Sequence, residues 1–249
     1  YYFGRPGTVG DRPGNLIAQN SDLLIVLGSR LNIRQIGYNW KAFARESKII
    51  MVDIDKNELK KHTLNVDYPI VDDLHSFISL LNKNLNEDLK EKSKWIDYCK
   101  MVNKKYPVFN KKYSKSKLVN PYYFMNELGS LLKENQIIVS ADGTACVAAF
   151  QGIPIKKGQR LYTNSGCASM GYELPASIGA WQHDKKEIVC IAGDGSIMLN
   201  IQELTTIAEN KMNIKIFLLN NDGYHSIRQT QNNFFNRQVG CGPDSDLFF

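Results

Sequence analysis

The stretch that most constrains this chain runs from Glu187 to Asn221, where two apolar runs flank a segment with helical spacing. The first run, Ile-Val-Cys-Ile-Ala, ends at Gly193, and the second, Ile-Lys-Ile-Phe-Leu-Leu, ends at Asn220-Asn221. Between the runs, four residues recur at the spacing of one helix face, namely Ile201, Leu204, Thr205 and Ala208. The order strand, helix, strand predicts a parallel βαβ unit and therefore an α/β fold.

Polar residues directly follow both predicted strands. Because the carboxyl ends of parallel strands share one edge of the sheet, where open sheets bind ligands, Asp194 and Asn221 are expected side by side. A carboxylate and a carboxamide oxygen suit a hard cation such as Mg²⁺, which leaves room for phosphate oxygens. Gly193 and Gly195 allow close backbone approach, and Ser196 offers a hydroxyl at the start of the next helix. The stretch predicts a site for a metal-bridged diphosphate, although Asp-Gly and Asn-Asn-Asp-Gly also occur as ordinary turns.

The remaining sequence predicts two doubly wound, mostly parallel sheets. Residues 1–85 hold two apolar strands, Asp22–Leu27 and Ile49–Val52, with helical patterns around them, and form a nucleotide-type α/β domain. Residues 86–118 are rich in Lys, Asn and Glu and form a connector with one helical pattern. Residues 119–249 form the second α/β domain, which contains the predicted diphosphate site.

Composition narrows the classes of partner. The net charge of +6 is modest, and much of it comes from lysines between Lys83 and Lys117, which favours a solvated surface over a nucleic-acid site. The five cysteines form no Cys-x-x-Cys pair, which indicates reduced thiols in a cytoplasmic protein. No segment is apolar for the length that a membrane span needs. The chain opens at Tyr1 without methionine, and we interpret it as an internal, C-terminally truncated fragment of a longer protein.

The pairing of Gly-Asp-Gly with Asn-Asn at this distance resembles the fingerprint of thiamine diphosphate (ThDP) enzymes. The resemblance implies that Mg²⁺ is held by Asp194, Asn221 and the main-chain oxygen of Gly223. It further implies that the loop after the strand at 137–140 donates hydrogen bonds to the diphosphate, from Gly143, Thr144 and Ala145.

A second segment strengthens this resemblance. Residues 165–180, Ser-Gly-Cys-Ala-Ser-Met-Gly-Tyr-Glu-Leu-Pro-Ala-Ser-Ile-Gly-Ala, are similar to the family's Gly-Leu-Gly-Ala-Met-Gly-Phe-Gly-Leu-Pro-Ala-Ala-Ile-Gly-Ala. The similarity implies that Gly166 lies at the cofactor and that the carbonyl of Ala168 accepts from the aminopyrimidine ring. Met170 would be the wedge that bends the cofactor, whereas an isolated methionine is more usually a core residue.

The first domain resembles the central domain of the acetohydroxyacid (acetolactate) synthase family, over residues 4–22 and 27–37. In flavin-containing members of that family, FAD is contacted at positions that match Arg30, Arg34, Asp53 and Asp72. Two departures leave FAD binding open. Val9 stands where many synthases have a flavin-contacting histidine, and Leu31-Asn-Ile33 replaces their Phe-Asp-Asp.

The resemblance implies ThDP- and Mg²⁺-dependent decarboxylation of a 2-keto acid, expected to be pyruvate, with carboligation to a second carbonyl. A decarboxylase or oxidase, and a non-catalytic nucleotide-binding module, remain alternatives. Thr230 stands where branched-chain synthases carry a channel tryptophan, which leaves room for another acceptor such as a keto sugar. The family's catalytic glutamate belongs to an N-terminal pyrimidine-binding domain that faces this one across a dimer interface, so a homodimer or homotetramer is expected.

Overall fold

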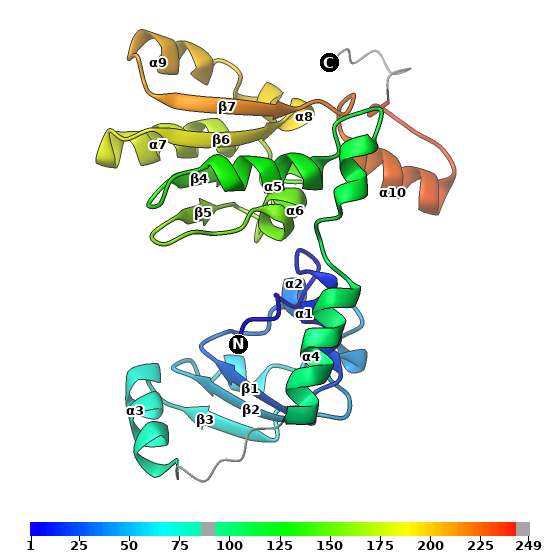
Figure 1. The fold of residues 1–249 in the computed structure, drawn as a ribbon, viewed down its shortest axis with the longest axis vertical. Coiled ribbons are helices and arrows are strands. Elements are labelled where there is room, and N and C mark those ends of the chain that lie inside the picture. The colour runs from blue at the N-terminus through cyan, green and yellow to red at the C-terminus, as the bar shows by residue number, and fades with distance from the viewer. Residues whose placement is uncertain (86–92, 243–249) are drawn as a thin grey trace. The chain divides into compact units, whose positions relative to one another are not determined.

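The computed structural model describes residues 1–85 and 93–242. Residues 86–92 of the predicted connector and residues 243–249 of the last predicted domain lie outside the described residues. The chain divides into two compact units, Tyr1–Val108 (unit 1) and Phe109–Phe249 (unit 2), and each has its own sheet (Figure 1). The boundary falls inside the predicted connector, because α4 (Ser93–Lys105) packs on α1 (Arg12–Gln19) within unit 1.

Unit 1 contains a three-stranded parallel sheet in the order β1-β2-β3. Its strands are β1 (Leu23–Leu27), β2 (Lys48–Asp53) and β3 (Tyr68–Val71). Its remaining helical elements are α2 (Ile33–Ile36), the 3-10 helices Trp40–Ala42 and Glu58–Lys60, and α3 (Leu74–Asn84). Apolar side chains of one sheet face, Val26, Ile49 and Met51, are buried in a cluster with Phe43 and Leu59.

The helix expected between the two strands of unit 1 shortens to one 3-10 turn, Trp40–Ala42. The backbone leaves helical geometry here, because the C-cap residue Phe43 is extended, with φ of −75° and ψ of 125°, and Ala44 then adopts a positive φ of 44°. Its amide donates to Gln19 Oε1 at 2.9 Å, which ties the loop to α1 instead.

Unit 2 contains a four-stranded parallel sheet in the order β5-β4-β6-β7. Its strands are β4 (Ile137–Ser140), β5 (Arg160–Tyr162), β6 (Ile188–Gly193) and β7 (Ile214–Leu219). Its helices are α5 (Pro121–Leu131), α6 (Thr144–Gly152), α7 (Glu173–Asp184), α8 (Asp194–Ile197), α9 (Glu203–Glu209) and α10 (His225–Phe235), with 3-10 helices at Lys111–Lys115 and Met198–Asn200.

Strand β6 is the centre of unit 2, because its side chains alternate between two separate cores. Val189 and Ile191 pack with residues of α5 and α6 on one face. Cys190 and Ala192 pack on the other face, with Leu174 of α7 and other apolar residues. Helices therefore cover both faces of a parallel sheet, which confirms the predicted α/β class with two parallel sheets.

The helical segment between β6 and β7 is interrupted, with 3-10 turn geometry between α8 and α9. The spacing that predicted this helix included Ile201 and Leu204, which are 43% and 36% exposed. Burial falls instead on Ile197 and Ile207, which pack in the core with Leu174.

Across residues 1–85 and 93–242, no helix has the length and apolar character needed to cross a membrane. Even α4, with 13 residues, is shorter than the roughly 20 residues that span a bilayer.

Candidate functional site

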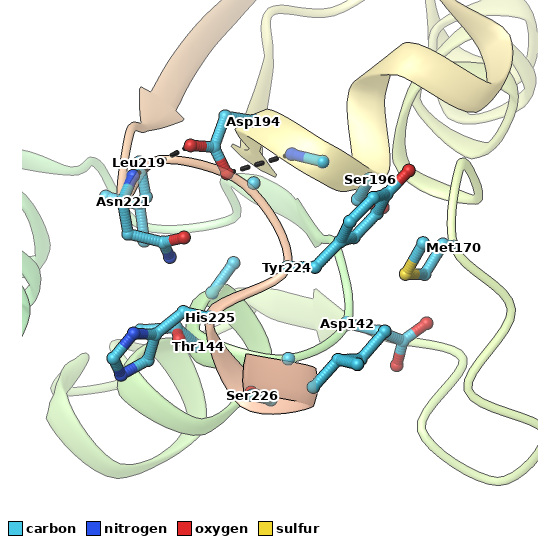
Figure 2. A pocket seen from close by; sticks show the side chains of 15 residues that line it. Asp142, Thr144, Met170, Asp194, Ser196, Leu219, Asn221, Tyr224, His225 and Ser226 are labelled. Atoms are coloured by element: carbon cyan, nitrogen blue, oxygen red, sulfur yellow. Dashed lines mark hydrogen bonds between the residues drawn. The ribbon is translucent and has the colours of Figure 1, made fainter. Parts of the chain in front are cut away.

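The carboxyl ends of β4, β6 and β7 meet around one cavity in unit 2 (Figure 2). Asp142 follows β4, Asp194 follows β6, and Asn221 follows β7, and all three line this cavity. The structure therefore brings together residues far apart in sequence, because parallel strands deliver their carboxyl ends to the same edge.

The Asp194 carboxylate joins the start of α8, which follows β6 directly, to the loop that leaves β7. Its Oδ1 accepts a hydrogen bond from the Gly195 amide at 2.8 Å. Its Oδ2 accepts from the amides of Asn221 and Gly223, each at 2.8 Å (Figure 2 draws hydrogen bonds at this side chain). The side chain is 8% exposed, so these charge-assisted bonds are shielded from water and fix the relative position of the two segments.

The side-chain oxygen of Asn221 is a buried acceptor that lacks a partner. Asn221 Oδ1 has no hydrogen bond within the described residues, although its atom is inaccessible to solvent. A buried polar atom of this kind needs a partner, because leaving it desolvated costs about 1–3 kcal/mol. A hard cation beside Asp194 would provide that partner, so the donor set fits Mg²⁺.

Arg228, on α10, holds the other side of the loop after β7. Its guanidinium donates to the carbonyl of Asn221 at 2.7 Å and to that of Gly223 at 2.6 Å. It also donates to the carbonyl of Asp222, whose φ of 63° is left-handed. The loop is thus held by a carboxylate at its amides and a guanidinium at its carbonyls. The Gly223 carbonyl oxygen, which we expect to be a metal ligand, therefore already accepts one hydrogen bond from the Arg228 guanidinium.

The amino end of α6 is an uncapped helix terminus at the cavity wall. Gly143 is the N-cap residue, with φ of 67°, and no side chain caps the helix. Thr144 and Ala145 begin the helix and line the cavity with Gly143. The first amides of a helix have no intrahelical acceptor and attract anions, so this terminus suits a phosphate.

Close packing explains the glycine between Asp194 and Ser196. A Cβ atom at Gly195 would lie 2.7 Å from the Tyr224 ring, far inside van der Waals contact. Tyr224 lines the cavity beside Ser196, which is 5% exposed. Gly193, the remaining glycine predicted here, also lines the cavity.

Of the three residues expected around the cofactor rings, one lines the cavity and two do not. Met170 lines the cavity with the diphosphate-loop residues, and Figure 2 shows its side chain beside Tyr224 and Asp142. Ala168 and Gly166 do not line it. Ala168 has a left-handed φ of 56°, which is strained for a residue with a Cβ, and its amide donates to the carbonyl of Asn164 at 2.7 Å.

In unit 1, the predicted flavin contacts lie at the carboxyl edge of its own sheet. Asp53 ends β2, is 7% exposed, and accepts from the Asp55 amide at 2.9 Å. Asp72 follows β3, and Arg30 and Arg34 belong to the segment after β1. The Arg30 guanidinium lies 3.5 Å from Glu58, and 62% of its side chain is exposed, so this ion pair is weak.

Sequence reasoning missed Arg228 and Glu173. Arg228 follows Asn221 by seven residues and lies in the first turn of α10. The available signal was a guanidinium with five donors close in sequence to a loop of backbone carbonyls. Glu173 is a carboxylic acid at the first position of α7, directly before the apolar Leu174, and its side chain is fully buried. Within the described residues, no group of three or more His, Cys, Asp or Glu side chains could hold a metal ion. The candidate metal set therefore joins the Asp194 carboxylate to the amide oxygen of Asn221 and the carbonyl oxygen of Gly223.

Family models agree with this geometry. The model described as "Thiamine pyrophosphate enzyme, central domain" matches residues 1–81, and "Thiamine pyrophosphate enzyme, C-terminal TPP binding domain" matches residues 142–247. The chain thus combines two α/β units of a ThDP-binding protein. It belongs to the thiamine pyrophosphate enzyme family, and the predicted recognition is confirmed.

Curated relatives refine the comparison. The chain is 32% identical over 241 residues to "Acetolactate synthase isozyme 1 large subunit" of Escherichia coli (strain K12), covering 95% of this chain and 41% of that protein. It is also 32% identical to "Acetolactate synthase large subunit" of Cyanidium caldarium, covering 95% of this chain and 40% of that protein. "Probable acetolactate synthase large subunit" of Methanococcus aeolicus is 32% identical, with 97% and 43% covered. The chain therefore spans about two fifths of the length of these relatives.

The Arg228 clamp yields a prediction about loop order. Arg228→Met should lower the free energy of unfolding by about 1–2 kcal/mol, because three carbonyls lose a charged donor at a partly exposed site. The amides of Asn221 and Gly223 should exchange hydrogen faster, since the loop is then held by Asp194 alone. Hydrogen exchange followed by mass spectrometry measures this, with the exposed Arg237→Met as the matched control. Equal protection in both variants would contradict the clamp.

Proposed function

We propose that unit 2 binds ThDP through Mg²⁺ in the cavity at the carboxyl ends of β4, β6 and β7. The observation that carries the proposal is the buried, unpartnered oxygen of Asn221 in the cavity that the Asp194 carboxylate and an uncapped helix terminus also line. The first pair suits a cation and the terminus suits an anion, which together are the two parts of a metal diphosphate.

Each residue then has a defined role. Asp194 and Asn221 would hold Mg²⁺, together with the Gly223 carbonyl if it shares its oxygen with Arg228. The amides of Gly143, Thr144 and Ala145 would bind phosphate oxygens. Gly195 leaves room for the Tyr224 ring, and the neighbouring Ser196 would offer its hydroxyl to the phosphates. Met170 would support the bent cofactor from the cavity wall.

When bound, ThDP supplies the nucleophile and the electron sink for cleavage beside a 2-keto carbonyl. The names of the relatives support acetolactate synthase-like chemistry, so we propose decarboxylation of pyruvate with ligation to a second carbonyl. The protein's share is to position the cofactor, to neutralise its diphosphate and to exclude water from the reacting carbon. By the same resemblance, the active form is proposed to be a homodimer or homotetramer.

The metal assignment predicts a specific loss of binding. Asp194→Ala removes the one charged ligand and also frees the amides of Asn221 and Gly223, so Mg²⁺-dependent ThDP affinity should fall below detection. Isothermal calorimetry on the full-length protein measures this, with Asp222→Asn as the control, because it removes an exposed charge from the same loop and asparagine tolerates the left-handed φ at this position. ThDP affinity unchanged by Asp194→Ala would rule out the metal site.

We further propose that unit 1 binds FAD at the edge formed by Arg30, Arg34, Asp53 and Asp72. The support is the shared sheet edge and the exposed Arg30 guanidinium, which is available to an anionic ligand. The full-length protein should therefore carry flavin absorbance or take up added FAD with a rise in melting temperature. Arg30→Met should weaken uptake, and Arg45→Met, on the same unit, should not. A colourless protein without a thermal shift would show that Val9 marks a lost site.

The acceptor is proposed to be bulkier or more polar than 2-ketobutyrate. Thr230 occupies the position of the family's channel tryptophan, and its hydroxyl donates to the carbonyl of Ser226 at 3.0 Å. A pocket contact that discriminates one methylene supplies about 1–3 kcal/mol, so its loss should largely erase the preference for 2-ketobutyrate over pyruvate.

Competition tests this directly. With pyruvate and 2-ketobutyrate supplied together, the full-length protein should form near-equal products, or form none until a keto sugar is added. Thr230→Trp should shift the ratio toward the 2-ketobutyrate product by about tenfold or more. A strong 2-ketobutyrate bias in the unmodified protein would instead support an ordinary branched-chain synthase.

A further inference from the structure

A buried carboxylic acid contacts α8, the short helix that follows β6. Glu173 is the first residue of α7, and its side chain is 0% exposed. The family segment quoted for residues 165–180 has glycine at this position, so the acid is an addition to the family pattern. Burying a carboxylic acid is costly unless its hydrogen-bonding groups are used, and the contacts of Glu173 show how they are used.

The contact of interest joins Glu173 to the cavity through Ser196. The Ser196 hydroxyl lies 2.9 Å from Glu173 Oε2. The same Oγ accepts a hydrogen bond from the Gly171 amide, also at 2.9 Å. Glu173 Oε1 is buried and has no hydrogen bond within the described residues. Because Ser196 lines the cavity, it links the buried acid to a ligand placed there.

Proton counting shows what this link can do. A serine hydroxyl has one proton to donate and two lone pairs that accept. The Gly171 amide uses one lone pair. If Glu173 is ionised, the Ser196 proton must point at the carboxylate, and none remains for the cavity. If Glu173 is neutral, its own proton occupies the second lone pair, and the Ser196 proton is free to turn toward an anion.

The surroundings favour the neutral acid. Burial raises the pKa of Glu173. Hydrogen bonds from its own backbone amide and from Ser196 act against burial, and the negative charge of Asp142 acts with it, so the pKa stays raised. Asp142 follows β4 and lines the cavity itself.

The other strands and helices packed against α7 bring no compensating cation to Glu173 within the described residues. On β6, the Cys190 thiol contacts the Glu173 carbonyl at 3.8 Å, and burial raises the pKa of this thiol to about 12, so it stays neutral. On β7, Lys215 pairs with Glu187 at 2.6 Å. The titratable residues of α9 are acidic, namely Glu203 and Glu209.

We propose that Glu173 is a positioning residue: in its neutral form it donates to Ser196 Oγ, and Ser196 in turn donates its own proton to the diphosphate of ThDP. The inference rests on the proposed function, because it requires a diphosphate in this cavity. Ionisation of Glu173 reverses the Ser196 hydroxyl and adds a negative charge near the phosphates, so cofactor affinity falls.

The test compares the full-length protein with Glu173→Gln across pH. The glutamine amide always donates to Ser196 Oγ and cannot ionise, so it imitates the neutral acid. Calorimetry in the presence of Mg²⁺ should give the two proteins equal ThDP affinities at about pH 5. Toward about pH 9, the ThDP affinity of the unmodified protein should fall below that of Glu173→Gln by about tenfold or more. The ratio of the two affinities cancels groups that titrate in both proteins, including the diphosphate.

Two further variants separate the hydroxyl from the charge and from misfolding. In a Ser196→Ala background the ratio should lose most of its pH dependence, because no hydroxyl is left to reorient. Glu173→Gly restores the family residue and should also bind ThDP with the pH profile of Glu173→Gln. A pH dependence that persists in full without Ser196 would overturn the proposal, as would a constant ratio with Ser196 present.

A measurement without cofactor keeps the inference separate from the proposed function. A carboxyl group whose pKa is raised by folding binds more protons in the folded state, so stability falls as pH rises above the unfolded value of about 4.3. Denaturant unfolding should show the unmodified protein losing stability relative to Glu173→Gln over that range. No ThDP binding at any pH would overturn the proposed function, whereas binding with a constant ratio would overturn only the role of Glu173.

Discussion

The site depends on the Asp194 carboxylate and the three backbone amides that donate to it. Two of these amides belong to the loop after β7, and one belongs to α8, which follows β6. A single side chain therefore sets the spacing between α8 and that loop. Both carboxylate oxygens accept hydrogen bonds, and Asp194 is nearly buried. Moving either backbone segment would therefore leave a buried carboxylate without its donors, which is costly. The rest of the cavity wall is built outward from this connection.

Opposite charges are arranged on the two sides of that connection. Arg228 binds the carbonyls of the same loop whose amides bind Asp194, which holds the loop in a conformation with two successive left-handed residues, Asp222 and Gly223. Such residues are strained unless their surroundings fix them, and strain of this kind concentrates at functional sites. The clamp therefore supplies a rigid loop at the point where Asn221 needs an external partner.

The two buried acidic residues Asp194 and Glu173 have different hydrogen-bond partners. Asp194 is surrounded by amide donors and remains a suitable cation ligand. Glu173 shares a hydrogen bond with the Ser196 hydroxyl, and burial raises the pKa of its carboxyl group. Two carboxyl groups on neighbouring elements thus have different hydrogen-bond partners, which is why we propose a metal role for one and a donor role for the other.

The sequence alone determined the parallel α/β units and the meeting of Asp194 with Asn221. Continuous apolar runs ending in polar residues require buried parallel strands, and the carboxyl ends of such strands share one edge whatever the details of packing. Short strands such as β3 and β5 gave no such signal, because they carry few buried apolar side chains. The Arg228 clamp and the link from Glu173 to Ser196 were decided by tertiary structure. Their partners are single atoms separated by 5 to 7 residues for the clamp and by 23 for the link, and only the folded backbone brings these atoms within hydrogen-bond distance.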